Sequence, residues 1–476
     1  MSGPFDGLRT TLDELDHRGR LVVVGNGMAA TRLVEELVAR RAPYAITVVG
    51  DEPGPAYNRI LLSAVLEGSH PASALTLRGR EWYDGHGVEL LTGTRVATVD
   101  RDARAVTLED GRHRGYDRLV LATGSIPTLP PIRGLVRVDG TLDPRVHAFR
   151  SRADCARLDA AVARGGRAGV VGGGLLGLQV ARALAARDVE VDLVEGAGHL
   201  LASQVGETAG AVLRRSVERL GTEVHTHTRA VRLTDAGLRL DTGWTIDTDL
   251  VVLTAGGRPS TALAKRAGLY VRRGVVVDGS MASVTDDRVH AIGDCAEHRG
   301  RVTGFVPPAW EQAGVLADVL TGGPRRYDGH RAVARLRATG LDVAVLGDPE
   351  HTDGEVVEVA NPVRCSYRKL VVRGGVVEAA VLVGDLSRVG LLTGLYDRRT
   401  VLGTDEPAAL LMPERTAPAP TLADDAEVCA CAGVSAARVR ACADLAEVRE
   451  RTRATTGCGG CGDVVRGLLA PEAAAV

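Results

Sequence analysis

The sequence has few aromatic residues, which make up 3% of its 476 positions, and it has no long apolar run. No stretch approaches the roughly 18 to 20 uninterrupted apolar residues that a membrane-spanning helix requires. The formal net charge of −2 gives no general excess of positive charge for binding nucleic acid. Residues 1–18 are polar and lack the basic start and apolar core of a signal peptide. We therefore expect a polar tail and a cytoplasmic protein that binds neither membrane nor nucleic acid.

The cysteines are unevenly distributed along the chain. None of the 8 occurs before Cys155. Four are scattered, which does not fit the disulfide framework of a secreted protein; these are Cys155, Cys295, Cys365 and Cys442. The other four form two tight pairs close to the C-terminus, Cys429-x-Cys431 and Cys458-x-x-Cys461. Their clustering requires an explanation of its own.

The segment after the polar tail has the pattern of a dinucleotide-binding turn. A buried apolar strand at Leu21–Val24 leads into G-x-G-x-x-A, formed by Gly25, Gly27 and Ala30, and an amphipathic helix follows. The first glycine permits the tight turn, the second admits a pyrophosphate, and the small third residue lets helix and strand pack closely. The next strand ends in Asp51 and Glu52, where a ribose hydroxyl needs an acceptor. Of these two acids we favour Glu52.

The same pattern recurs farther along the chain. Gly172, Gly174 and Gly177 follow a second apolar strand and begin a second helix, and Glu195 ends the strand after it. An acid there accepts hydrogen bonds from ribose hydroxyls and repels a 2′-phosphate, which favours NADH over NADPH. The alternative is that the acid only makes the end of the strand more soluble. Two such patterns predict two dinucleotides on one enzyme.

The order of these segments resembles the two-dinucleotide flavoprotein reductases, the group that includes glutathione reductase and rubredoxin reductase. Further strand-to-turn segments carry the resemblance, at "LVLATGSIP", "LVVLTAGGRP" and "VHAIGDCAE". The resemblance implies one set of residues that contact FAD: Gly25, Gly27, Ala30, Glu52, Arg59, Thr123, Gly124 and Asp294. It implies a second set that contacts the nicotinamide nucleotide: Gly172, Gly174, Gly177, Glu195 and Gly256.

The stretch "PAYNRILLS" at 55–63 has no cysteine. Disulfide-reducing members of this group carry a C-x4-C pair in that region, and some peroxide or CoA-disulfide enzymes carry a single cysteine. We therefore expect no thiol-based active site next to the flavin. Electrons must leave FAD by another route.

The two C-terminal cysteine pairs offer such a route. Four thiolates are the ligand complement of a [2Fe–2S] cluster, and the neighbouring glycines let backbone amides turn toward sulfur. Structural zinc is the alternative, although C-x-C is less usual for zinc, and a site with neither metal is the third. The segment resembles the bacterioferritin-associated-ferredoxin-like [2Fe–2S] domain, with ligands Cys429, Cys431, Cys458 and Cys461. The interval between the pairs is shorter than usual in that family, and Cys442 within it is expected to be a packed residue.

A segment of alternating apolar strands and one helix separates the flavoprotein region from the cysteines, and a linker rich in Pro, Ala and acids follows it. The whole order resembles the N-terminal half of the large subunit of assimilatory NAD(P)H nitrite reductases. It also resembles the electron-transfer subunit of assimilatory nitrate reductases. The nitrite reductases continue into a sirohaem and [4Fe–4S] module, whereas this sequence ends at Val476. The resemblance therefore implies electron delivery to a separate nitrate or nitrite reductase.

We predict an α/β fold with two Rossmann-like dinucleotide-binding domains of the glutathione-reductase kind, a small α+β domain and a small helical [2Fe–2S] domain. The expected boundaries are 19–140 with 258–325 for FAD, 141–257 for NAD(P)H, 326–410 for the α+β domain, 411–425 for the linker and 426–476 for the cluster. No side chain is expected to act as an acid–base catalyst, and a homodimer is expected by analogy. Alternative functions are a rubredoxin or ferredoxin reductase of an oxygenase system, an NADH oxidase, and a redox-sensing flavoprotein with zinc.

Overall fold

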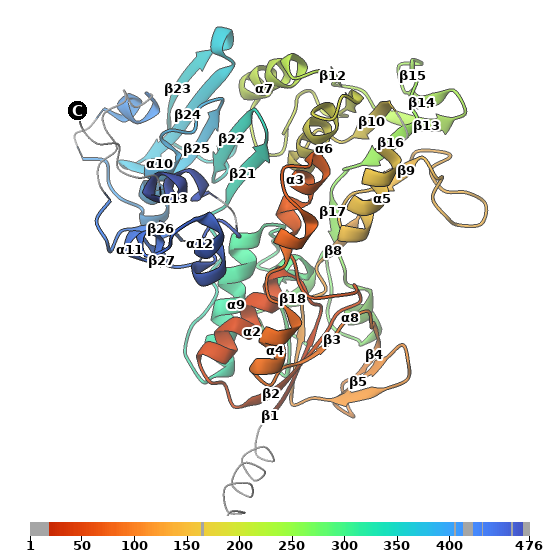
Figure 1. Cartoon of the computed structure of the whole chain (residues 1–476), viewed down its shortest axis with the longest axis vertical. Coiled ribbons are helices and arrows are strands. Elements are labelled where there is room, and N and C mark those ends of the chain that lie inside the picture. The colour runs from red at the N-terminus through yellow and green to blue at the C-terminus, as the bar shows by residue number, and fades with distance from the viewer. Residues whose placement is uncertain are drawn as a thin grey trace, which may run out of the picture.

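The computed structural model describes residues 19–162, 166–403, 406–412, 422–430, 432–457 and 460–469. The polar tail, most of the expected linker and the expected ligands Cys431 and Cys458 lie outside these described residues. Within them, the chain forms two nucleotide-binding units, an antiparallel sheet domain and a small C-terminal domain (Figure 1).

A parallel sheet of five strands forms the first unit, in the order β19-β7-β1-β2-β3. Its central strand, β1, is apolar and buried from Leu21 to Val24, as expected of a parallel strand that is covered on both faces. The strands are β1 (Gly19–Val24), β2 (Tyr44–Val49), β3 (Glu89–Leu91), β7 (Arg118–Leu121) and β19 (Val289–Ala291). The last strand comes from much later in the sequence, so the unit is built from two separate parts of the chain.

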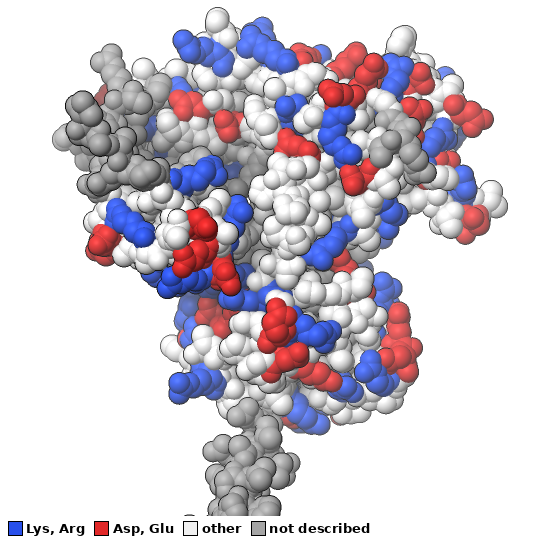
Figure 2. Space-filling model, viewed as in Figure 1, with Lys and Arg blue, Asp and Glu red and all other residues white. Residues whose placement is uncertain are grey.

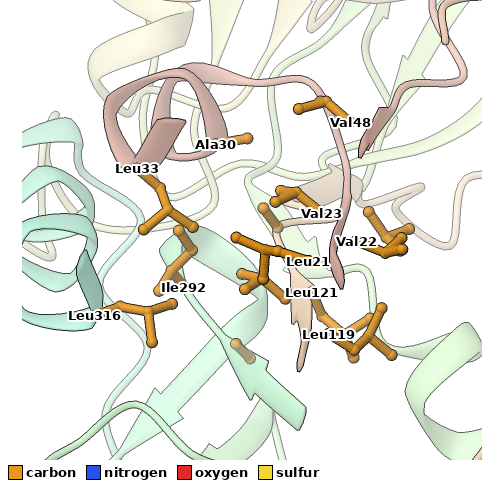
Figure 3. Packing of buried hydrophobic residues seen from close by; sticks show 14 of the residues in the cluster. Leu21, Val22, Val23, Ala30, Leu33, Val48, Leu119, Leu121, Ile292 and Leu316 are labelled. Atoms are coloured by element: carbon orange, nitrogen blue, oxygen red, sulfur yellow. The ribbon is translucent and has the colours of Figure 1, made fainter. Parts of the chain in front are cut away.

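The helices α2 (Met28–Ala39) and α9 (Val306–Leu320) pack against each other beside this sheet (Figure 1). Figure 3 shows Leu33 of α2 and Leu316 of α9 on either side of Ile292, close to Leu21 of β1. All four side chains are fully buried. Burying each such side chain stabilises the fold by about 1.5–3 kcal/mol. This packing fixes the start of α2 at the end of β1.

The second unit repeats the design with the strand order β12-β11-β10-β16-β9, again parallel throughout. Its strands are β9 (Val146–Ala148), β10 (Arg167–Val171), β11 (Glu190–Val194), β12 (Thr222–His225) and β16 (Leu250–Leu253). Its helices are α5 (Arg152–Val162), α6 (Leu175–Ala185) and α7 (Glu207–Arg219). Two short strands, β8 (Ser125–Pro127) and β17 (Gly257–Pro259), pair antiparallel where the chain passes between the units.

Smaller elements complete these two units. Each unit carries a three-stranded antiparallel sheet, and short helices connect the main strands. The sheets are β4 (Val96–Asp100), β5 (Ala105–Leu108) and β6 (His113–Gly115), and β13 (Ala230–Thr234), β14 (Gly237–Leu240) and β15 (Thr245–Ile246). The other elements are η1 (Arg59–Leu61), α3 (Leu62–Glu67), η2 (Ala72–Leu75), α4 (Arg80–Gly85), α8 (Ala262–Arg266), β18 (Val275–Val277), η3 (Gly293–Cys295) and β20 (Ala296–His298).

The third domain is an antiparallel sheet in the order β21-β22-β25-β24-β23, and helix α10 (Val389–Arg398) packs on it. Its strands are β21 (Val333–Ala338), β22 (Leu341–Leu346), β23 (Glu355–Asn361), β24 (Ser366–Arg373) and β25 (Val376–Val383). Two single-turn helices, η4 (Pro362–Arg364) and η5 (Pro407–Leu411), flank the sheet. The expected combination of alternating strands and a terminal helix is confirmed.

In its described residues, the C-terminal domain combines one hairpin with three short helices. Its elements are β26 (Glu427–Cys429), β27 (Val434–Ser435), α11 (Ala436–Arg440), α12 (Leu445–Thr452) and α13 (Gly462–Leu469). Figure 1 shows it beside α2 and α9 of the first unit, near α10 of the sheet domain. Among the described residues, no helix has the length and apolar character that crossing a bilayer demands.

Candidate cofactor site

One large cavity, of 2350 Å³, connects the first nucleotide-binding unit with the C-terminal domain. Figure 2 shows the hollow, with blue Lys and Arg side chains along its edge. It is lined by all of the expected FAD residues except the buried Ala30, namely Gly25, Gly27, Glu52, Arg59, Thr123, Gly124 and Asp294. The expected metal ligands Cys429 and Cys461 line the same cavity. The structure thus brings together two groups of residues that are far apart in the sequence.

The first glycine turn has the shape that a pyrophosphate site needs. Gly25 has φ +112°, and a Cβ there would collide with the carbonyl oxygen of Ala122. Gly27 precedes the first residue of α2, and a Cβ there would point into open space. Ala30 is fully buried against the sheet. The turn therefore leaves room above Gly27 at the N-terminus of the helix, where a phosphate is favoured.

Glu52 is held at the cavity by two neighbours from the "PAYNRILLS" segment. The Tyr57 hydroxyl donates to Glu52 Oε2 at 2.7 Å, and Arg59 forms an ion pair with Glu52 Oε1. Burial raises the pKa of Tyr57 above its usual range, and the hydrogen bond to Glu52 adds to that effect. Asp51, the other acid considered, also lines the cavity and pairs with the exposed Arg95 at 3.3 Å. Glu52 is the more enclosed of the two acids.

Asp294 is part of a network that the sequence did not indicate. Its Oδ2 atom accepts hydrogen bonds from Ser125 Oγ at 2.8 Å and from Arg150 at 2.7 Å. Nearby, Thr123 donates to the carbonyl oxygen of Ser260 at 2.7 Å. Arg150 comes from the segment before α5, and no local pattern marks it, because its partners lie far away in the sequence. The network fixes the orientation of Asp294 toward the cavity.

The second glycine turn repeats the first in the second unit. Gly172 has φ +114°, and a Cβ there would lie 2.8 Å from the carbonyl oxygen of Thr254. A Cβ at Gly174 would point into open space, whereas one at Gly177 would collide with the carbonyl oxygen of Gly172. Gly256 follows β16, and its carbonyl oxygen accepts from the Thr128 amide at 3.0 Å. Space for a second pyrophosphate therefore lies above Gly174, at the N-terminus of α6.

The thiols near the first unit are buried and held as neutral donors. Cys295, next to Asp294, is fully buried, and its Sγ donates to the carbonyl oxygens of Leu121 and Ile292, both at 3.3 Å. Burial raises the pKa of the Cys295 thiol. Burial also raises the pKa of the Cys155 thiol to about 11, with the charge of Asp159 contributing. Neither side chain has the low pKa of a reactive thiolate.

The described cysteines of the C-terminal pairs lie in a small core. Cys429 ends β26 and Cys461 directly precedes α13, and both are buried. The Thr455 amide donates to Cys461 Sγ at 3.2 Å. An amide donor of this kind stabilises a thiolate and tunes a metal bound to it. Cys442 instead donates from Sγ to the carbonyl oxygen of Arg438, four residues earlier, at 3.4 Å. This contact fits the expectation that Cys442 is a packed residue.

The glycine turns, their helices and the acids at the strand ends define an oxidoreductase that uses FAD and a nicotinamide nucleotide. The chain belongs to the family Pyridine nucleotide-disulphide oxidoreductase, which matches residues 19–313. Residues 333–400 match the Rubredoxin NAD+ reductase C-terminal domain.

Individual relatives agree with this assignment. The chain is 34% identical to the nitrite reductase (NAD(P)H) of Bacillus subtilis (strain 168) over 467 residues, which are 94% of this chain and 57% of that protein. It is 32% identical to the assimilatory nitrate reductase electron transfer subunit of the same organism, over 94% of this chain and 59% of that protein. The chain thus spans less than two thirds of the length of these relatives. Its structure resembles the covalent putidaredoxin reductase–putidaredoxin complex with a TM-score of 0.75, at 26% identity over 82% of this chain and 95% of the other.

Proposed function

We propose that this cytoplasmic protein passes electrons from NADH through FAD and a [2Fe–2S] cluster to a separate nitrate or nitrite reductase. The observation that carries the proposal is the shared cavity, whose lining includes Glu52, Arg59 and Asp294 as well as Cys429 and Cys461. A cluster held by these cysteines would border the same cavity as the bound flavin.

The two glycine turns support the cofactor assignment. Gly25, Gly27, Ala30, Glu52, Arg59, Thr123, Gly124 and Asp294 would hold FAD, and Gly172, Gly174, Gly177, Glu195 and Gly256 would hold NADH. The open space above Gly27 and Gly174 fits a pyrophosphate at each helix N-terminus. The buried Oδ1 atom of Asn26, between the first two glycines, has no hydrogen-bond partner among the described residues, which fits a ligand at this turn. With this function we assign 19–140 and 258–325 to FAD, 141–257 to NADH, 326–410 to the α+β domain and 426–476 to the cluster.

The donor set at the C-terminus fits iron and sulfide. Cys429 and Cys461 would ligate the cluster together with Cys431 and Cys458, and the Thr455 amide would donate to a bound sulfur. A bound flavin would supply the exchange between the two-electron hydride donor NADH and a [2Fe–2S] cluster that accepts one electron at a time. The protein's own residues align the cofactors and keep thiols such as Cys295 protonated and out of the reaction.

The test is an anaerobic NADH titration of the purified protein, followed by visible absorbance and combined with assays for iron, zinc and acid-labile sulfide. We expect the flavin band and a broader iron–sulfur band to bleach together. Zinc without sulfide, or bleaching of the flavin alone, would refute the relay. A protein with this relay should then support nitrate or nitrite reduction when mixed with the corresponding catalytic subunit.

A second candidate is a reductase of an external ferredoxin or rubredoxin. The match of residues 333–400 to the Rubredoxin NAD+ reductase C-terminal domain favours it, as does the similarity to putidaredoxin reductase. The two functions differ in where the electrons leave the protein. A Cys429→Ser variant that still reduces an added ferredoxin at the wild-type rate would favour the second candidate.

A further inference from the structure

Asn58 joins the first unit to the loop that precedes Cys458 in the sequence. Its side chain is 1% exposed. The Nδ2 atom donates to the carbonyl oxygen of Gly457 at 3.0 Å and also to that of Thr456. Asn58 lies within "PAYNRILLS", the segment whose lack of cysteine excludes a thiol-based route from the flavin. This segment therefore has no cysteine of its own, but it contacts the loop that leads to Cys458.

The orientation of the Asn58 side chain is set by its own segment. Its Oδ1 atom accepts from the Ile60 amide at 3.0 Å and so caps η1, while its backbone amide donates to the Leu75 carbonyl oxygen at 2.8 Å. Because the cap uses the oxygen of the carboxamide, the nitrogen must point toward the C-terminal domain. Arg59, which pairs with Glu52 at the flavin cavity, is the next residue. One short turn thus contacts both the expected flavin site and the cysteine loop.

A partly buried ion pair provides a second contact between the same two parts. Glu35 of α2 pairs with Arg453, at the end of α12, and with Arg78 at 2.7 Å. The side chains of Glu35 and Arg453 are 13% and 18% exposed. Burial lowers the pKa of Arg453 to about 10, and the charge of Arg32 contributes. Separating the pair would leave the largely enclosed Arg453 guanidinium without this partner, which is unfavourable.

The contacted loop also carries a hydrogen bond to sulfur. Thr455, directly before the two carbonyl groups that Asn58 binds, donates its amide to Cys461 Sγ at 3.2 Å. Cys461 lines the same cavity as Arg59. Any displacement of Thr456 and Gly457 would therefore move a residue that touches a cysteine sulfur.

We propose that Asn58 is a positioning residue, whose carboxamide holds the cysteine loop at the flavin cavity and thereby sets the rate of electron transfer between flavin and cluster. This inference rests on the proposed function. The transfer moves one electron from reduced flavin to oxidised cluster, and no bond forms or breaks in the two segments that Asn58 joins. Its rate falls steeply with the distance between the two centres, so a loosened loop slows it.

The test compares Asn58→Asp with Asn361→Asp. An Asp at position 58 keeps the volume and the cap of η1 but cannot donate to the carbonyl groups of Thr456 and Gly457. Asn361 caps η4 in the same way, by accepting from the Arg364 amide at 3.1 Å, and it lies in the antiparallel sheet domain. It therefore reports the effect of an Asn-to-Asp change at a similar cap elsewhere in the chain.

In rapid anaerobic mixing with NADH, Asn58→Asp should reduce its flavin at the wild-type rate and its cluster about tenfold more slowly. Asn361→Asp should match the wild type in both phases. The midpoint potential and electron paramagnetic resonance spectrum of the cluster should stay unchanged in Asn58→Asp, because its ligands are intact. Amide hydrogen exchange in residues 453–457 should be faster, a readout that does not depend on the cofactors. Glu35→Gln, which does not alter "PAYNRILLS", should give the same pattern.

Wild-type cluster reduction and amide exchange in both Asn58→Asp and Glu35→Gln would overturn the inference. Slower flavin reduction in Asn58→Asp would also overturn it, because Asn58 would then act on the flavin itself. Absence of an iron–sulfur band in the wild type would instead refute the proposed function. The amide exchange measurement separates the two failures, since it tests the contact at the loop with or without a cluster.

Discussion

Glu195 and Gly173 are joined by a hydrogen bond of 2.6 Å between the carboxylate Oε2 atom and the backbone amide. The other oxygen of Glu195 accepts from the Ala197 amide at 2.7 Å. Two amide groups therefore orient the carboxylate at the end of β11, against the glycine turn that follows β10. Neither donor is charged, so the negative charge of Glu195 is not neutralised by them and acts on any nucleotide bound at this turn.

Glu195→Ala should shift the nucleotide preference toward NADPH. Removing the carboxylate removes its hydrogen bonds to ribose hydroxyls and its repulsion of a 2′-phosphate. Arg229 packs against Gly196, so a cation stands beside the same site. We expect the ratio of kcat/KM for NADH to that for NADPH to fall about tenfold, measured with ferricyanide as the acceptor.

Glu190→Ala is the control for that change, because Glu190 lies at the opposite end of the same strand. It should leave the ratio unchanged. The double variant Glu195→Ala with Arg229→Ala should lose part of the gained NADPH activity. An unchanged ratio in Glu195→Ala would show that the acid at the end of β11 does not select the nucleotide.

Gly25→Ala should reduce the stability of the fold, whereas Gly27→Ala should reduce the binding of FAD. Gly25 has φ +112° and its Cβ would collide with Ala122, so the substitution should destabilise the fold by about 2–3 kcal/mol. Gly27 has an ordinary extended backbone and open space at its Cβ, so the protein should fold normally but retain little FAD. The measurements are the denaturation midpoint of the flavin-free protein and the flavin absorbance per chain after desalting. A Gly27→Ala protein with a full complement of FAD would contradict the assignment of this turn.

Cys429→Ser should remove the iron–sulfur band without removing the flavin. Loss of one ligand leaves the cluster incomplete, whereas NADH-dependent ferricyanide reduction at the flavin should continue. Cys442→Ser is the matched control, since Cys442 is equally buried in the same core but donates to the Arg438 carbonyl oxygen. It should keep its iron and sulfide. Equal iron content in the two variants would place the metal elsewhere.

The features that could be predicted from the sequence are those that depend on residues close together in the chain. The continuous apolar run at Leu21–Val24, the glycine turns and the acids at the strand ends are local patterns, and the structure forms the expected strands and helices around them. The helical stretch between the cysteine pairs divides into α11 and α12. Asp444 accepts from the Glu447 amide at 2.8 Å and Glu447 accepts from the Ala443 amide at 2.6 Å. This arrangement is a variant of the capping box, in which Glu447 accepts from the residue before the N-cap, and its D-x-x-E pattern in the sequence could have located the break.

The contacts that assemble the site could not be predicted in this way. Asn58 meets Gly457, Arg150 meets Asp294 and Glu35 meets Arg453 across long separations in the chain. Each of these side chains is polar, and the sequence pattern of its own segment is fully explained without the long-range contact. Which residues they contact depends on how the units pack against one another. The periodic patterns of a single sequence do not reveal that packing.

His290 should make the first unit sensitive to acid. It lies in β19 and is 3% exposed. Burial lowers its pKa to about 4, and the charge of Arg118 contributes. In the unfolded chain a histidine has a pKa of about 6.5, so between these two values the unfolded state binds a proton that the folded state does not. The stability is therefore complete above about pH 6.5 and decreases as the pH falls toward 4, by about 2 kcal/mol at about pH 5.

His290→Leu should remove most of this dependence, because leucine has no proton to bind. We expect the denaturation midpoint of the wild type to fall more than that of the variant when the pH is lowered from about 8 to about 5. His113→Leu, at an exposed histidine of β6, should behave like the wild type. The comparison is made between pH values within each protein, so a constant change in stability from the substitution itself does not affect it. Parallel acid responses in His290→Leu and the wild type would assign the sensitivity to other groups.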